Sequence, residues 1–185
     1  MILRGDLKDL LDEVVSLYEY HPYWIFADGQ KTKNPDADEY TYKIMDLKDN
    51  SAQKQRGVIE ELAKFLGRRL EENIAIVVVP SHDPEKRTSG IRKLASALAT
   101  DGRIDACTCL VRHTKVPKKS GGGDRNIEVD LNSIRVENIE VIENRPVLLL
   151  DDVTTSGNSL KACKILLKRS GVKYIQRLAI GRTVH

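Results

Sequence analysis

Apolar runs alternate with amphipathic segments through the second half of the chain, and this alternation restricts the fold more than any other feature of the sequence. The runs are IAIVVV (74–79), DACTCLV (105–111), VLLL (147–150) and YIQRLAI (174–180). Between them, SGIRKLASALA (89–99) and SLKACKILLKRS (159–170) have helical spacing, with Ser89 capping the first and Gly171 closing the second. Strands that are apolar throughout are typical of a parallel sheet buried on both faces. We therefore predict an α/β fold with a central, mostly parallel sheet flanked by helices.

The N-terminal part of the chain is less regular. Apolar residues at helical spacing predict a helix over 6–20, which Pro22 would end. The aromatic run YWIF and a polar loop follow. The pattern then predicts a strand over Tyr40–Leu47 and a helix that extends to about Glu72.

Length and composition limit the class of protein. The 185 residues favour a single domain, in which 1–40 form an N-terminal extension and 41–185 the core. Thirty basic and 27 acidic side chains leave a net charge of +3, which is too small to indicate a general nucleic-acid binder. The N-terminus is charged, no apolar run is long enough to span a membrane, and there are three cysteines. We expect a reduced, cytoplasmic protein without a membrane partner.

The stretch VLLLDDVTTSGNSL (147–160) carries the clearest chemical signal. Asp151 and Asp152 follow a buried strand, and ligands collect at the carboxyl ends of strands in open α/β sheets. The turn TTSGNS then leads into a helix, whose N-terminal amides attract anions, and Gly157 would let the backbone approach a phosphate. Two carboxylates beside a phosphate cradle suit a ribose 5-phosphate. The alternatives are a turn that serves only as a helix cap and a P-loop hydrolase, which would need a G-x-x-x-x-G-K-[ST] loop that this sequence lacks.

These residues resemble a known family. VLLLDDVTTSGNSL is similar to the phosphoribosyl pyrophosphate (PRPP) motif of type I phosphoribosyltransferases, and the ComF-like group has the most similar pattern. Three other stretches agree with that group: YKIMDLKD, VVVPSHDPEKRTSG and RHTKVPKKSGGGDRN. The resemblance covers roughly residues 40–181 and implies the type I phosphoribosyltransferase fold with a hood-like N-terminal extension. ComF proteins begin with a cysteine-rich zinc finger, whereas the first cysteine here is Cys107, so a role in DNA uptake does not transfer.

The resemblance implies a reaction and a set of site residues. PRPP would transfer its phosphoribosyl group to a nitrogen acceptor and release pyrophosphate, with Mg²⁺ as cofactor. Asp151 and Asp152 would bind the ribose and hold Mg²⁺ directly or through water. The 5-phosphate would be bound by Thr154, Thr155, Ser156, Gly157, Asn158 and Ser159. Pyrophosphate would be bound by Ser81, His82 and Asp83, and the catalytic cations of the following basic loop would be Arg112, Lys118 and Lys119.

The sequence is compatible with three roles for the basic loop RHTKVPKKSGGGDRN (112–126). The loop could close over the site, be a solvated hairpin, or contact nucleic acid, although it lacks the interleaved aromatic residues that stack on bases. The residues after it, IEVDLNSIRVENIEVI, predict short alternating strands. The whole protein could be a non-enzymatic PRPP sensor or a ComF-like nucleic-acid-associated accessory protein, and a homodimer is compatible with the sequence.

Three smaller groups of residues have competing interpretations. His82 could contact a phosphate or make only local hydrogen bonds. For Cys107, Cys109 and His113 we favour buried thiols over a metal site, since no further ligand pair is present. The aromatic residues Tyr20, Tyr23 and Trp24 could cover an acceptor base, but we favour burial in the core.

Overall fold

A computed structural model describes residues 2–4, 13–27, 29–49, 51–117 and 126–184. Within these ranges, five strands form one sheet in the order β1-β9-β8-β4-β5, and every neighbouring pair is parallel. Their bounds are Val14–Tyr20 for β1, Ile175–Thr183 for β9, Val147–Thr154 for β8, Ala75–Val78 for β4 and Ile104–Asp105 for β5. The predicted α/β fold with a parallel central sheet is confirmed.

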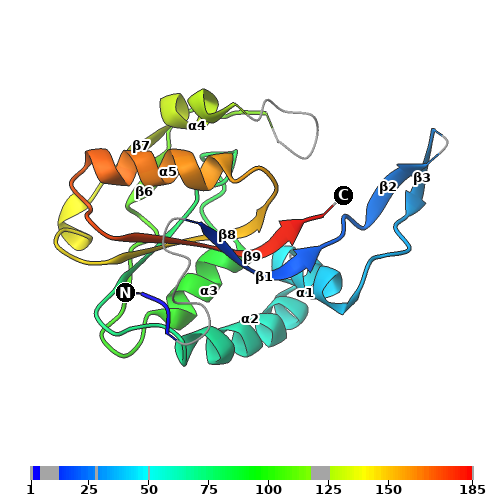
Figure 1. Ribbon diagram of the computed structural model, residues 1–185, viewed down its shortest axis with the longest axis horizontal. Coiled ribbons are helices and arrows are strands. Elements are labelled where there is room, and N and C mark those ends of the chain that lie inside the picture. The colour runs from blue at the N-terminus through cyan, green and yellow to red at the C-terminus, as the bar shows by residue number, and fades with distance from the viewer. Residues whose placement is uncertain (1, 5–12, 28, 50, 118–125, 185) are drawn as a thin grey trace.

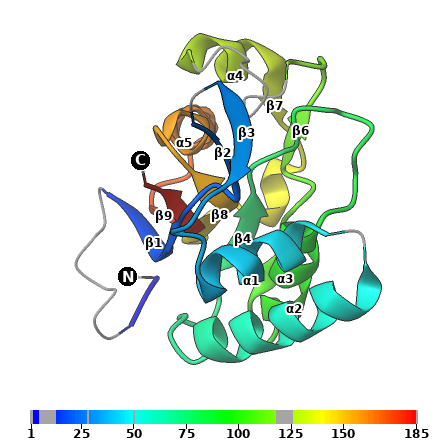
Figure 2. The same cartoon turned by 90° about the vertical axis from the view of Figure 1, so that its right-hand side faces the viewer.

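Helices cover both faces of this sheet (Figures 1 and 2). One face is covered by α1 (Glu39–Lys48) and α3 (Gly90–Leu98), with α2 (Ala52–Gly67) packed against both. The other face is covered by α5 (Asn158–Arg169), and α4 (Ile127–Ser133) packs on α5, farther from the sheet. Alternate residues of β4 and β8 therefore enter two different cores. Ile76 and Leu148 pack on the α1–α3 side, whereas Val77 and Leu149 pack against α5. This double burial is the reason that these strands read as continuous apolar runs.

Two small antiparallel pairs lie outside the central sheet. One is the hairpin of β2 (Trp24–Ala27) and β3 (Gln30–Lys33), which projects away from the body of the protein (Figure 1). The other pairs β6 (Leu110–Arg112) with β7 (Ile134–Val136), and a short 3-10 helix, η3 (Ile139–Val141), follows.

The predicted N-terminal helix is wrong over the residues that the structure describes. Residues 14–20 form β1, which pairs along its length with β9 at one edge of the sheet. The start of the predicted helix, 6–12, lies outside the described residues. Valine and tyrosine favour strands, and the open edge of β9 supplies a partner that helical periodicity could not reveal. Because β1 belongs to the central sheet, the expected boundary at residue 40 does not separate extension from core; the part that projects is the β2–β3 hairpin.

The strand predicted over Tyr40–Leu47 is also wrong, because this segment forms α1. The side chain of Asp38 caps the helix by accepting a hydrogen bond from the Thr41 amide at 2.8 Å. Thr41, Ile44 and Leu47 are spaced three residues apart and are its buried positions, as a helix packed on one face requires.

Predictions around residues 105–136 are partly wrong. DACTCLV is not one strand: β5 ends at Asp105, whose carboxylate accepts a hydrogen bond from the Cys107 amide, and β6 begins five residues later. The next segment begins with α4 and not a strand, because the Asn126 side chain caps it by accepting from the Glu128 amide. The strand β7 follows, as the alternation predicted.

Helices α1, α2 and α3 are locked together at one point. A Cβ placed on Gly90, the first residue of α3, would lie 1.8 Å from the Leu47 carbonyl oxygen, so only glycine fits there. The buried side chain of Gln55 on α2 donates to the Leu47 and Asp49 carbonyls at the end of α1. Its amide oxygen accepts from Lys93 on α3. These contacts bring the end of α1 and the start of α3 into direct backbone contact.

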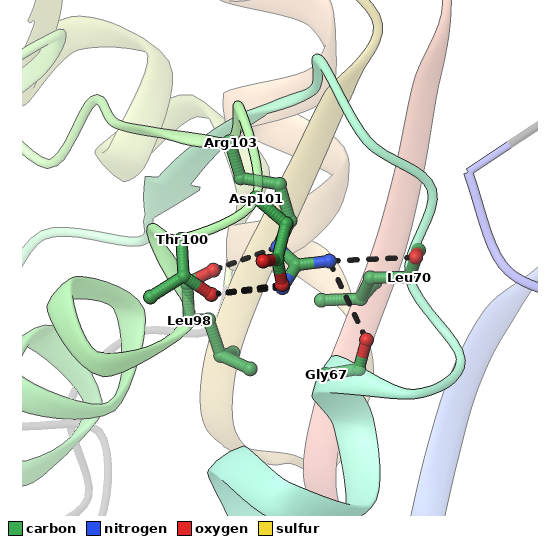
Figure 3. A network of polar contacts seen from close by, with 6 residues as sticks. All are labelled: Gly67, Leu70, Leu98, Thr100, Asp101 and Arg103. Carbon is green, nitrogen blue, oxygen red and sulfur yellow. Dashed lines mark hydrogen bonds and ion pairs between the residues drawn. The ribbon is translucent and has the colours of Figure 1, made fainter.

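A buried arginine joins the other ends of α2 and α3 (Figure 3). Arg103 donates from Nε to the Leu98 carbonyl at 2.8 Å and from Nη1 to the Gly67 carbonyl at 3.4 Å. Its second terminal nitrogen bonds Asp101 at 2.8 Å. A guanidinium at the C-terminal ends of two helices satisfies carbonyls that have no intrahelical donor and is favoured by both helix dipoles.

Among the described residues, no helix is long and apolar enough to cross a membrane.

Candidate functional site

The aspartate pair lies inside strand β8 and not after it. The strand runs to Thr154, and both Asp151 and Asp152 are half-buried where it passes beyond the end of β4. Leu150 and Val153 both pack against the α1–α3 core although they are three residues apart, so the regular alternation of the strand is interrupted at the aspartates. Each aspartate accepts the amide that follows it, at 2.9 Å for Asp151 and 2.6 Å for Asp152. The pairing of β8 with β9 keeps the same register on both sides of the aspartates, from Val147 opposite Ile175 to Thr154 opposite Arg182, so no extra residue is inserted into the strand.

Lys48, at the end of α1, supplies a positive charge beside the pair. Its Nζ lies 3.4 Å from Oδ1 of Asp152 and 5.7 Å from the centre of the Tyr20 ring. The sequence prediction missed Lys48, because it placed the preceding residues, Tyr40–Leu47, in a strand and so did not see Lys48 as the end of a helix. The capping pattern at Asp38, followed by apolar residues at helical spacing, was the signal that could have located it.

The turn after β8 distributes its hydroxyl groups unevenly. Thr154 is buried, with 4% of its surface exposed, so its side chain faces protein and not a ligand. The Thr155 hydroxyl lies 2.9 Å from the Thr183 hydroxyl at the end of β9, which ties the turn to the sheet. Ser156 is exposed, whereas Asn158 and Ser159 are half-buried in the first turn of α5. Of the six residues predicted to bind the 5-phosphate, Thr154 is thus placed to support the turn.

Gly157 has the backbone conformation that the proposed cradle needs. It precedes α5 with a φ of +75°, a left-handed value that side chains other than glycine seldom adopt, and it provides no side-chain cap to the helix. A Cβ at this position would meet only ordinary contacts, 3.7 Å to Val14 and 3.9 Å to Thr154. The requirement for glycine is therefore one of backbone angle and not of space. The turn directs the first amides of α5 and the positive end of its dipole toward the edge where β8 ends.

The predicted pyrophosphate loop leaves the same edge of the sheet, because it follows β4, the parallel neighbour of β8. Ser81 and His82 are in contact through Oγ and Nδ1 at 3.4 Å. Asp83 forms an ion pair with Lys115 at 2.7 Å, and the hydrogen bond from that lysine holds the pKa of the Asp83 carboxyl below its usual value. The Val116 amide donates to the His82 carbonyl at 3.0 Å. The loop is thus tied to the segment after β6.

Arg112 has a structural role that the sequence prediction did not include. Its side chain is buried, with 4% exposed, and forms an ion pair at 2.9 Å with Asp130 on α4, which is fully buried. Two other nitrogens donate to the Ser81 carbonyl and to the Ser133 hydroxyl. Arg112 therefore fixes the Ser81 loop to α4 and is turned away from solvent. Lys118 and Lys119, the other two cations predicted to be catalytic, lie outside the described residues.

The aspartate pair fits the requirements of Mg²⁺. Among the described residues, no group of three or more His, Cys, Asp or Glu side chains is placed to hold a metal ion. Mg²⁺ typically uses one or two carboxylates and takes its remaining oxygens from water and substrate phosphates. Cys107 and Cys109 are buried and free, as we expected, and burial raises the pKa of Cys109 to about 11.

The aromatic residues near the N-terminus are less buried than we predicted. Tyr20 and Tyr23 are half-buried, but Trp24 is 51% exposed, so its predicted place in the core is wrong. Because the hairpin follows β1 directly, it stands at the carboxyl edge of the sheet, the same edge from which the aspartates and the Ser81 loop emerge (Figure 1).

Comparison with known proteins adds no independent assignment: no family model matches the chain, and no significant match is found among curated proteins.

Proposed function

We propose that this protein binds PRPP together with Mg²⁺ and transfers the 5-phosphoribosyl group to a nitrogen acceptor. The observation that carries the proposal is the junction of β8 and α5. Asp151 and Asp152 lie half-buried near the carboxyl end of β8. Gly157, with its left-handed backbone, then directs the N-terminus of α5 to the same edge of the sheet. A ribose 5-phosphate needs this combination, since its hydroxyl groups donate to carboxylates and its phosphate accepts from amides.

Each part of the substrate has residues suited to it. Asp151 and Asp152 take the ribose hydroxyls, and the backbone from Thr155 to Ser159, with the exposed Ser156 hydroxyl, takes the 5-phosphate. Ser81, His82 and Asp83 lie on the neighbouring strand's loop, where the pyrophosphate of the same molecule would extend. The Ser81 hydroxyl and the backbone amides of this loop could donate hydrogen bonds to the pyrophosphate.

The reaction would be a displacement at C1 of the ribose. The nitrogen of the acceptor forms the new bond as the bond from C1 to pyrophosphate breaks, and the ribose carries positive charge in between. Such a transition state is stabilised by fixed charges more than by covalent help. Asp151 and Asp152 would hold Mg²⁺ directly or through water, and the ion would neutralise charge on the departing pyrophosphate. Among the described residues, Lys48 and Lys115 lie beside Asp152 and Asp83 at this edge and could serve the same purpose.

The decisive experiment is calorimetry with PRPP and Mg²⁺. The double variant Asp151→Asn with Asp152→Asn keeps side-chain size and removes the charge, so we expect PRPP affinity to fall at least tenfold. Glu60→Gln is the matched control, because Glu60 is an exposed α2 carboxylate that pairs with Arg56 on its own helix. Equal PRPP affinity in the double variant and the wild type would refute the site. A screen for pyrophosphate release with bases and small amines then tests the transfer.

The second candidate is a PRPP sensor without transferase activity. It is favoured by one observation: Arg112, the described member of the predicted catalytic cations, is buried in a contact with Asp130. A sensor would bind PRPP in the calorimetric experiment and release no pyrophosphate with any acceptor. A cytoplasmic location belongs to the proposal in either form, since the three buried cysteines form no disulfides, which suits a reducing compartment.

A further inference from the structure

The β2–β3 hairpin presents large aromatic side chains to solvent. In its register Trp24 lies opposite Lys33 and Phe26 opposite Lys31, so these four side chains share one face of the ribbon. Trp24 is 51% and Phe26 79% exposed, and every residue of β3 is exposed. Exposed aromatic groups gathered in this way are typical of a binding surface, because a soluble protein otherwise covers them.

Lysines accompany these rings. Lys31 Nζ lies 4.7 Å from the centre of the Trp24 ring, and Lys33 Nζ lies 5.6 Å and 5.7 Å from the rings of Tyr23 and Tyr42. The described residues of the two strands include no acidic side chain. The surface therefore combines flat apolar faces with positive charge and has no carboxylate within its strands.

We infer that this face of the hairpin binds single-stranded nucleic acid. Unpaired bases would stack on Trp24 and Phe26, and Lys31 and Lys33 would move from the ring faces to the phosphates between the bases. The two rings lie in one row on β2 and the two lysines in a parallel row on β3, which suits a single strand because its bases extend to one side of its phosphates. The basic loop considered from the sequence lacks such aromatic residues, whereas the hairpin has both.

Other occupants of the hairpin fit less well. In a symmetric contact with a second copy, the same lysines would face one another across the interface and repel. In a duplex the bases are already stacked within the helix, so their faces are closed to Trp24 and Phe26. The net charge of the whole chain is only +3, so attraction for a polyanion depends on this local surface. The inference uses residues that the proposed PRPP site does not, and it stands or falls separately from that proposal.

Trp24 is the only tryptophan in the chain, so its fluorescence reports directly on the hairpin. We expect a single-stranded oligonucleotide such as oligo(dT) to quench this emission in a saturable way. The midpoint should rise with salt, because phosphate contacts release counterions. The duplex of the same length should quench much less at equal nucleotide concentration.

Variants separate stacking from charge, with oligonucleotide anisotropy as a second readout. Phe26→Ala should weaken binding about fivefold or more, the range expected for loss of one stacked base. The double variant Lys31→Ala with Lys33→Ala should weaken binding and flatten its salt dependence. Tyr174→Ala is the matched control, since Tyr174 is 68% exposed but lies just before β9, away from the hairpin in sequence; its affinity should equal that of the wild type.

Several results would overturn the inference. One is unchanged Trp24 emission up to about 100 μM oligonucleotide, a concentration at the weak end of non-specific nucleic-acid binding. Another is equal affinity for the duplex and the single strand. Quenching by a free nucleoside monophosphate as strong as by the oligonucleotide would indicate a site for one base instead. A dimer in sedimentation that Phe26→Ala dissociates would assign the face to a second copy. Thermal unfolding of each variant checks that the exposed substitutions leave the fold intact.

Discussion

Replacing Gly157 by alanine tests the backbone conformation on which the proposed phosphate cradle depends. The added Cβ meets no close contact, with Val14 at 3.7 Å and Thr154 at 3.9 Å, so the cost comes from the φ of +75°. A left-handed conformation costs a residue with a Cβ about 1–2 kcal/mol. For a chain of this size, that loss lowers the melting temperature by roughly 2–8 °C. The protein should still fold.

Gly171 supplies the matched control. It also has a positive φ, +92°, with no atom within 4 Å of its missing Cβ, but it lies just beyond the other end of α5. Gly171→Ala should therefore cost about the same stability as Gly157→Ala. The two variants should differ in ligand binding, because relaxing the strain at Gly157 turns the first amides of α5 away from the 5-phosphate.

The assay is calorimetric titration with ribose 5-phosphate and with PRPP, beside thermal unfolding of both variants. We expect Gly157→Ala to bind both ligands at least tenfold more weakly, which corresponds to about 1.4 kcal/mol, and Gly171→Ala to bind as the wild type does. If Gly157→Ala binds ribose 5-phosphate normally, the turn serves only to begin the helix. An equal loss in both variants would show that binding follows stability alone, and the cradle would again be refuted.

Three further predictions concern stability. In Gly90→Ala the new Cβ would clash with the Leu47 carbonyl oxygen at the end of α1, so the free energy of unfolding, measured in urea, should fall by about 3 kcal/mol or more. In Gly57→Ala, in the middle of α2, the new Cβ would have no atom within 4 Å, so the same measurement should show a gain of about 0.5–1 kcal/mol. Arg112→Ala removes the guanidinium that neutralises buried Asp130 and should cost about 3–5 kcal/mol; unchanged stability with lost turnover would instead support the catalytic role predicted from the sequence. Because burial raises the pKa of Cys109 from 9.0 to about 11, the unfolded chain loses this proton first, so stability should fall as the pH rises above about 9, and less steeply in Cys109→Ala.

The local sequence was sufficient to predict a helix or strand where the pattern of apolar and capping residues within that element determines its structure. β4, β8, α3 and α5 were predicted because double burial makes a strand apolar throughout and because caps such as Ser89 and Gly171 mark helix ends. The same reasoning located the turn at Gly157, and the structure adds that the residue has a positive φ. These features depend on residues within a few positions of one another.

Sequence reasoning failed where a distant segment decides the structure. Val14 and Tyr18 fit a helical stripe as well as a strand, and only pairing with β9, more than a hundred residues later, selects the strand. The contact of Lys48 with Asp152 also joins segments more than a hundred residues apart. Arg112 was assigned to a basic loop because its neighbours in sequence are basic, but its partner Asp130 lies on a helix that the sequence pattern did not predict.

The lysine contacts at the carboxyl edge bear on how the proposed site would accept its ligand. Lys48 is paired with Asp152 and Lys115 with Asp83, and all four side chains retain exposure to solvent. Exposed pairs of this kind contribute little to stability, so they are easily exchanged. A ligand that carries both phosphates and a divalent cation offers new partners for both members of each pair: the phosphates attract the lysines, and the cation attracts the carboxylates. PRPP with Mg²⁺ is such a ligand, whereas PRPP alone would leave the carboxylates facing a polyanion. If the site binds PRPP as proposed, this arrangement of charge would favour binding of the metal and the sugar phosphate together.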